Sequence, residues 1–185
     1  MLSGARIKLA SPFRARIEVA GFVLMVLVGV SPQQGPLSKA APPAQDEAHH
    51  QGVVSRGDHA MGFSHETTTH HFRLYKDGGA IEVLANDPKD TASRDQIRMH
   101  LGHIAKLFAA GDFNIPGFIH ATEPPGTSVM ARLREQIHYH YVDTSRGASL
   151  RITTANPEAV AAVHSFLRFQ IRDHQTGDTT NISTP

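Results

Sequence analysis

The chain has 185 residues, a formal net charge of +1 and no cysteine, yet it contains 13 histidines. The lack of cysteine excludes disulfide bonds and thiolate metal sites. The near-neutral charge provides no basic surface of the kind that binds nucleic acids, so we expect no nucleic-acid partner. Imidazole is the commonest metal ligand and titrates near neutral pH, so the histidines favour metal or proton chemistry.

Residues 1–40 are predicted to be a signal peptide. Basic residues precede an unbroken run of apolar residues and glycine over 19–30. This run is too short for a membrane span, which needs about 20 apolar residues. Small residues at Ser38 and Ala40 favour cleavage after Ala40. The alternative is an uncleaved N-terminal anchor, which would be the chain's membrane contact.

Cleavage would change the charge of the protein. Residues 1–40 carry a net +4 and the whole chain +1, so the remaining residues carry −3 with histidine neutral. We therefore expect a mildly acidic protein in the periplasm or outside the cell.

The rest of the chain divides into three predicted segments. Residues 41–65 are rich in Pro, Gln, Ala, Gly and His without apolar periodicity, which predicts a disordered, histidine-containing arm. Residues 66–178 are periodic and long enough for a single domain with one core. Residues 179–185 are predicted to be a frayed tail.

The periodic segment contains the same pattern twice. A predicted β-hairpin over 68–85 precedes a helix that reaches about Ala110, and a second hairpin over 137–154 precedes a helix that reaches about His174. The pattern predicts an α+β fold. Its two ββα halves form a four-stranded antiparallel sheet with the helices packed on one face.

Each predicted helix begins at an asparagine-containing turn with a proline. Asp87 is the predicted N-cap of the first helix and Asn156 that of the second, with a proline following each. A Gly/Pro-rich connector over 112–125 and a short helix over about 128–135 separate the two halves.

The first predicted helix carries the best candidate metal ligands. Its apolar stripe consists of Ile97, Leu101, Ile104 and Phe108. Met99, His100 and His103 lie on one flank of this stripe, at spacings that bring their side chains within reach of one ion. Two imidazoles and a thioether suit copper, whereas two imidazoles and a carboxylate suit zinc or iron. The alternative is an amphipathic helix whose boundary histidines are half-buried and hydrogen-bonded.

Other histidines could complete such a site. His164 lies on the apolar stripe of the second helix as the approximate counterpart of His100, although a single histidine there is more often a hydrogen-bonded core residue. On the first strand, His70 is predicted to point inward and His71 outward. His174 lies at the end of the second helix, where a cationic imidazole would interact favourably with the helix dipole.

Several motifs resemble a family of small exported bacterial proteins of unknown function. They are Met61-Gly62-Phe63, Thr69-His70-His71-Phe72, Asp77-Gly78-Gly79, the segment 95–101, Pro124-Pro125-Gly126 and the segment 166–171. The resemblance covers about residues 58–178. Some members of that family carry the name aspartate carbamoyltransferase, but this chain lacks the Ser-Thr-Arg-Thr and His-Pro-Thr-Gln segments of those enzymes. The resemblance implies a single domain and an envelope location, and it supplies no activity.

The sequence therefore favours an exported protein that binds a transition metal, copper or zinc. The expected ligands are Met99, His100 and His103, with His71 or His164 completing the site. One alternative is a module that binds a small ligand or a partner protein without a metal. The other is an enzyme with a histidine general base, which no nucleophile, paired acid or catalytic motif supports.

Overall fold

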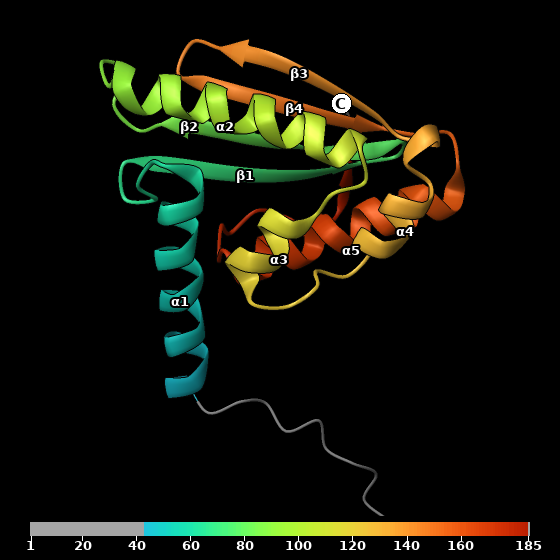
Figure 1. The fold of residues 1–185 in the computed structure, drawn as a ribbon, viewed down its shortest axis with the longest axis horizontal. Helices are drawn as coiled ribbons and strands as arrows, with labels where there is room; N and C mark the ends of the chain where they lie inside the picture. Colours follow the sequence, from blue (N-terminus) through green and yellow to red (C-terminus); the bar gives the residue numbers. More distant parts are fainter. Residues whose placement is uncertain (1–42, 185) are drawn as a thin grey trace, which may run out of the picture. The chain divides into compact units, whose positions relative to one another are not determined.

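The computed structural model describes residues 43–184, so the predicted signal peptide lies outside the described residues. The described residues form an α+β fold (Figure 1), which confirms the predicted fold class. The helices are α1 (Pro43–Met61), α2 (Thr91–Ala109), α3 (Asn114–His120), α4 (Thr127–Arg132) and α5 (Pro157–Asp173), and a 3-10 turn, η1, spans Arg134–Gln136. Within residues 43–184, no helix is both long enough and apolar enough to cross a membrane.

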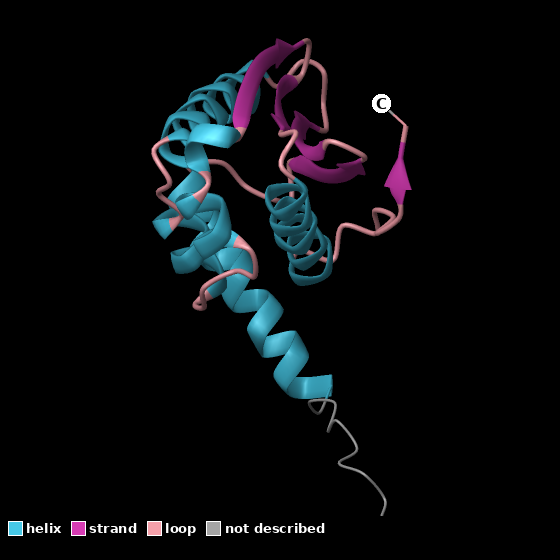
Figure 2. Ribbon diagram, turned by 90° about the vertical axis from the view of Figure 1, so that its right-hand side faces the viewer, coloured by secondary structure: helices cyan, strands magenta, loops and turns pink. Residues whose placement is uncertain are grey.

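The strands form one sheet in the order β3-β4-β2-β1-β5. They are β1 (Thr68–Tyr75), β2 (Gly78–Ala85), β3 (His138–Thr144), β4 (Gly147–Thr153) and β5 (Ile182–Ser183). The first four pair antiparallel, whereas β5 pairs parallel with β1 near the C-terminus (Figure 2). The sheet is therefore five-stranded and mixed, not four-stranded and antiparallel as predicted, because the predicted frayed tail supplies β5.

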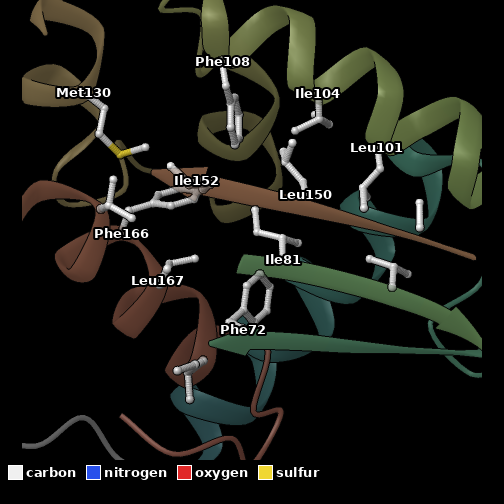
Figure 3. Close-up of a cluster of buried hydrophobic side chains, with 14 of the residues drawn as sticks. Phe72, Ile81, Leu101, Ile104, Phe108, Met130, Leu150, Ile152, Phe166 and Leu167 are labelled. Carbon is white, nitrogen blue, oxygen red and sulfur yellow. The ribbon is translucent and has the colours of Figure 1, made fainter. Parts of the chain in front are cut away.

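One face of the sheet carries the core (Figure 3). Phe72, Ile81, Leu150 and Ile152 lie on this face of β1, β2 and β4 and are buried. The predicted stripe of α2 packs on them: Ile97, Leu101, Ile104 and Phe108 are all buried. Phe166 and Leu167 of α5 pack on the same face. Burial of such side chains contributes about 1.5–3 kcal/mol each, so these contacts fix where α2 and α5 lie.

The two long helices begin at different kinds of turn. The N-cap of α5 is Asn156, as predicted, and its side chain accepts hydrogen bonds from the next turn. The N-cap of α2 is Asp90 and not Asp87, because the Asp90 side chain accepts from the Ser93 amide at 2.9 Å. Asp87 instead accepts from the Lys89 amide at 2.8 Å, within the turn that precedes the helix.

Residues 43–61 form a helix, α1, where the sequence predicted a disordered arm. Val53 is fully buried and Met61 is nearly so. The Arg56 guanidinium donates from Nε to the Ile119 carbonyl at 2.8 Å. Because α1 is held by contacts with α3 and α5 and not by a broad apolar stripe, its own sequence carries little helical signal.

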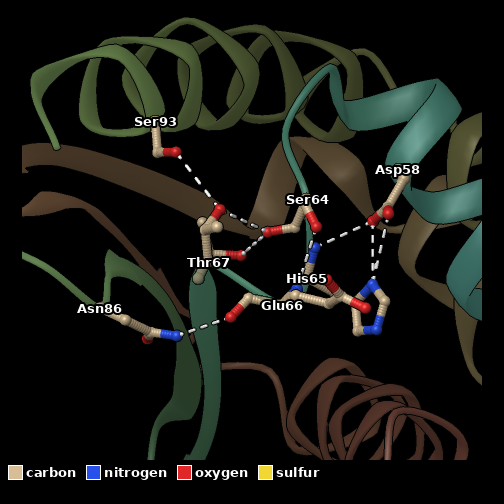
Figure 4. A network of polar contacts seen from close by, with 8 residues as sticks. Asp58, Ser64, His65, Glu66, Thr67, Asn86 and Ser93 are labelled. Atoms are coloured by element: carbon tan, nitrogen blue, oxygen red, sulfur yellow. Dashed lines mark hydrogen bonds and ion pairs between the residues drawn. The ribbon is translucent and has the colours of Figure 1, made fainter.

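Polar contacts fix the loop between α1 and β1 (Figure 4). The Asp58 carboxylate accepts from the His65 backbone amide at 2.9 Å and lies 3.2 Å from its Nδ1. Thr67 donates from Oγ1 to the Ser64 carbonyl at 3.2 Å. These contacts set the path by which the chain leaves α1 and enters the sheet.

The connector between the two hairpin–helix units contains α3, which the sequence did not predict. Pro116 is the third residue of α3, and a residue in the first helical turn needs no hydrogen bond from its nitrogen. The short helix predicted at about 128–135 is present as α4 and η1. The last residue of α3 is His120, which the helix places beside α5.

Candidate functional site

Four histidines from four parts of the fold line one cavity. They are His70 on β1, His100 on α2, His120 at the end of α3 and His174 directly after α5. The cavity has a volume of about 60 Å³, which is room for roughly four water molecules. The other lining residues are Met61, Phe72, Ile81, Val83, Leu101, Ile104, Phe108, Ile115, Pro116, Ile119, Phe166 and Gln170. We call this site the histidine cavity.

The rings of these histidines form a continuous series of contacts. The rings of His70 and His174 are nearly parallel, at 7°, with centroids 5.6 Å apart. His120 meets His174 edge to face, with centroids 4.9 Å apart. The ring of Phe63 lies between those of His70 and His100, with its centroid 6.0 Å from that of His70 and 5.8 Å from that of His100. The inward orientation predicted for His70 is confirmed, since its ring lines the cavity.

His120 is held by two side chains of α5. The histidine is almost fully buried, and its Nδ1 hydrogen-bonds to a carboxylate oxygen of Asp173. Its Nε2 lies 3.0 Å from Oε1 of Gln170. The second carboxylate oxygen of Asp173 lies 2.9 Å from Nε2 of His49 in α1. Asp173 therefore connects α1 to the wall of the cavity.

Gln170 leaves one polar atom without a partner. Its side chain is buried, and within residues 43–184 its amide nitrogen has no hydrogen-bond acceptor. A buried donor in this state costs about 1–3 kcal/mol. Because Gln170 lines the cavity, its amide is available to a molecule that enters.

Burial keeps three of the four imidazoles neutral. It lowers the pKa of His70 to about 4, and the neighbouring His100 imidazole lowers it further. Burial, with a contribution from His103, also lowers the pKa of His100 to about 4. The pKa of His174 is well below its usual value, first because of burial and then because of His70 and His120. The interpretation of His174 as a cation at the helix end is therefore wrong, since desolvation outweighs the helix dipole.

The predicted ligands of the first helix share a surface depression. Met99, His100 and His103 line it together with Ala60 and Met61 of α1. Met99 is 71% exposed and His103 is exposed. Of the three, His100 also lines the histidine cavity, so the structure brings the predicted ligands together at the surface but only one of them reaches the interior.

The two residues predicted to complete the site lie elsewhere. His164 is buried and donates from Nε2 toward the carbonyls of Tyr75 at 2.8 Å and Gly78 at 3.0 Å. It is a hydrogen-bonded core residue that closes the turn between β1 and β2. The Nδ1 of His71 pairs with Asp178 at 3.0 Å, on the face of the sheet opposite His70.

No family model, curated protein or solved structure matches the chain. The resemblance to a family of small exported bacterial proteins therefore stays a prediction. In the part of the chain that the structure describes, no group of three or more histidine and carboxylate side chains is arranged to hold a metal ion.

Four residues of this site were not predicted from the sequence. Gln170 and His174 are four residues apart at the end of the second helix, a spacing that places them on one face. That spacing could have indicated a polar site on this face of the helix, and Asp173 directly precedes His174. His120 gave no signal, because it lies in a connector without periodicity and faces α5 only in the folded protein.

Proposed function

We propose that the protein binds a small ligand in the histidine cavity. The unpartnered amide nitrogen of the buried Gln170 is the observation that carries this proposal. A cavity with mostly apolar walls and a few convergent polar groups is the usual form of a small-molecule site. A ligand that accepts a hydrogen bond from this amide removes the cost of leaving it unpaired.

The histidines suit this role because they are polar without being charged. A neutral imidazole offers one N–H donor and one acceptor nitrogen. Three such rings face the same space beside Phe72 and Phe108. They orient a ligand by hydrogen bonds while the aromatic and aliphatic walls bury the rest of it.

The proposal includes the location that the sequence predicts. With the leader removed, the protein would act in the periplasm or outside the cell. A binding protein there would deliver, store or sense its ligand.

The proposal is tested by identifying the small molecules that copurify with the protein. The parent chain, the variant Gln170→Leu and the control Gln96→Leu are isolated from the envelope fraction, and bound small molecules are identified by native mass spectrometry. Gln96 is exposed on α2, so the control changes the same residue type outside the cavity. We expect one molecule in the parent and the control and a clearly lower occupancy in Gln170→Leu. Ligand-free protein throughout, or equal occupancy in all three, contradicts the proposal.

A transition metal, copper or zinc, is the second candidate for the same cavity. The Asp173 carboxylate holds Nδ1 of His120, and metal-ligating histidines usually make such a contact with their second nitrogen. The ligands would be His70, His100, His120 and His174 after rotation of their rings, in place of Met99 and His103.

Calorimetric titration with copper and with zinc separates the two predicted metal sites. Loss of binding in His174→Ala but not in His103→Ala supports the cavity, and the reverse supports the helix surface. Binding that survives both substitutions contradicts a metal site at either place.

A further inference from the structure

Three side chains behind the histidine cavity form a hydrogen-bond chain with a defined direction. The Asp173 carboxylate only accepts, so Nδ1 of His120 donates to it. Nε2 of His120 faces Oε1 of Gln170 at 3.0 Å, and an amide oxygen also only accepts. The amide nitrogen of Gln170, which only donates, remains for the cavity.

The side chains that face the cavity are uncharged or paired. The carboxylate of Asp173 lies directly against His120 and does not line the cavity. The remaining cavity histidines are neutral because of burial. Among the residues that line the cavity in the described part of the chain, none is Asp, Glu, Lys or Arg. An organic ion that entered would lose its hydration without gaining a counter-charge, so the cavity disfavours charged organic ligands.

We infer that the histidine cavity recognises a small uncharged molecule that presents a hydrogen-bond acceptor to the amide nitrogen of Gln170. This inference rests on the proposed function and specifies the class of its ligand. The acceptor is a carbonyl oxygen, an ether oxygen or a ring nitrogen. The body of the molecule lies against Phe72, Ile104 and Phe108, which line the same cavity. Gln170 is the specificity-determining residue, and His120 and Asp173 position it.

Three small rings of similar size test this inference. Benzene has no polar atom, pyridine has an acceptor nitrogen and pyrrole has a donor N–H. Their affinities for the full chain are measured near neutral pH by titration, with the histidine ring resonances as the readout. One net hydrogen bond predicts that pyridine binds about three- to tenfold more tightly than benzene. Pyrrole should bind less tightly than pyridine.

Matched variants assign the preference to one residue. In Gln170→Leu, the preference for pyridine over benzene should fall by about three- to tenfold, because the amide donor is gone and the apolar wall is kept. In Gln96→Leu, the preference for pyridine should be unchanged. If Gln170→Leu does not fold, the order of pyridine and pyrrole in the unmodified chain still decides the inference.

The possible failures are distinguishable. If none of the three rings perturbs the cavity histidines, both the inference and the proposed function are overturned. If the rings bind but pyrrole is preferred, the Gln170 amide presents its oxygen to the cavity and the inference alone is wrong. A preference for pyridine that is undiminished in Gln170→Leu likewise overturns the inference and leaves the binding site in place.

Discussion

The imidazole rings of His70 and His174 lie nearly parallel in the interior, with centroids 5.6 Å apart, although one belongs to the first strand and the other follows the last long helix. Burial disfavours the protonated form of both rings and lowers the pKa of each below its ordinary value. The contact therefore couples the packing of α5 on β1 to the neutrality of the histidine cavity, and it makes stability depend on pH.

We predict that the free energy of unfolding falls as pH drops from about 6.5 to about 4. The pKa of His70 and that of His100 are about 4 in the folded protein, below the ordinary value of 6.5. The unfolded chain therefore binds more protons in this range. The stabilisation is fully present above pH 6.5, the pKa of a histidine in the unfolded chain. It is lost as the pH falls toward about 4, the pKa of these rings in the folded protein, by roughly 2–3 kcal/mol per ring. Urea denaturation at a series of pH values measures the loss.

The variant His100→Gln should reduce this pH dependence, and His140→Gln should not. His140 is exposed on the outer face of the sheet, away from the histidine cavity, so it is the matched control. An unchanged slope in His100→Gln would show that carboxylates, and not cavity histidines, produce the acid sensitivity.

We predict that α1 is protected from proteases. Limited digestion of the full chain should cut before about residue 43 and spare the helix, because Val53 is fully buried against the fold. Val53→Ala should cost roughly 1–3 kcal/mol of local stability and open the helix to cleavage. Ser55→Ala, at an exposed neighbouring position, is the control. Rapid cleavage within 43–61 of the parent would restore the disordered arm that the sequence predicted.

His164 should matter for stability and not for binding. Its ring donates toward the carbonyls of Tyr75 and Gly78, and His164→Leu leaves both carbonyls short of a donor in the interior. We expect a loss of roughly 1–3 kcal/mol in chemical denaturation, with probe binding in the histidine cavity unchanged at a temperature where the variant is folded. Weaker probe binding together with unchanged stability would place His164 in the functional site after all.

Local patterns predicted the parts of this fold that local sequence determines. The stripe of α2 from Ile97 to Phe108 and the Asn156 cap of α5 could be found because helix periodicity and capping act within a few residues. α1 and α3 could not be found in this way. Tertiary contacts, such as the one between Arg56 and Ile119, stabilise them.

The candidate site was harder to predict than the fold. Periodicity placed His70 inward and His100 on the flank of α2, but it does not say which elements meet. His174 and His120 reach the same cavity only because α5 and α3 pack beside β1. Helix spacing therefore predicted Met99 and His103 as ligands, although the fold leaves both side chains at the surface.

The most direct test of the account is whether the four cavity histidines respond to one ligand together. In histidine-labelled full chain titrated with pyridine, the ring resonances of His70, His100, His120 and His174 should shift along a single binding curve. The exposed His138 and His140 on the outer face of the sheet should stay unchanged. Separate curves for the four rings, or shifts of equal size at His138 and His140, would contradict a common binding site in the histidine cavity.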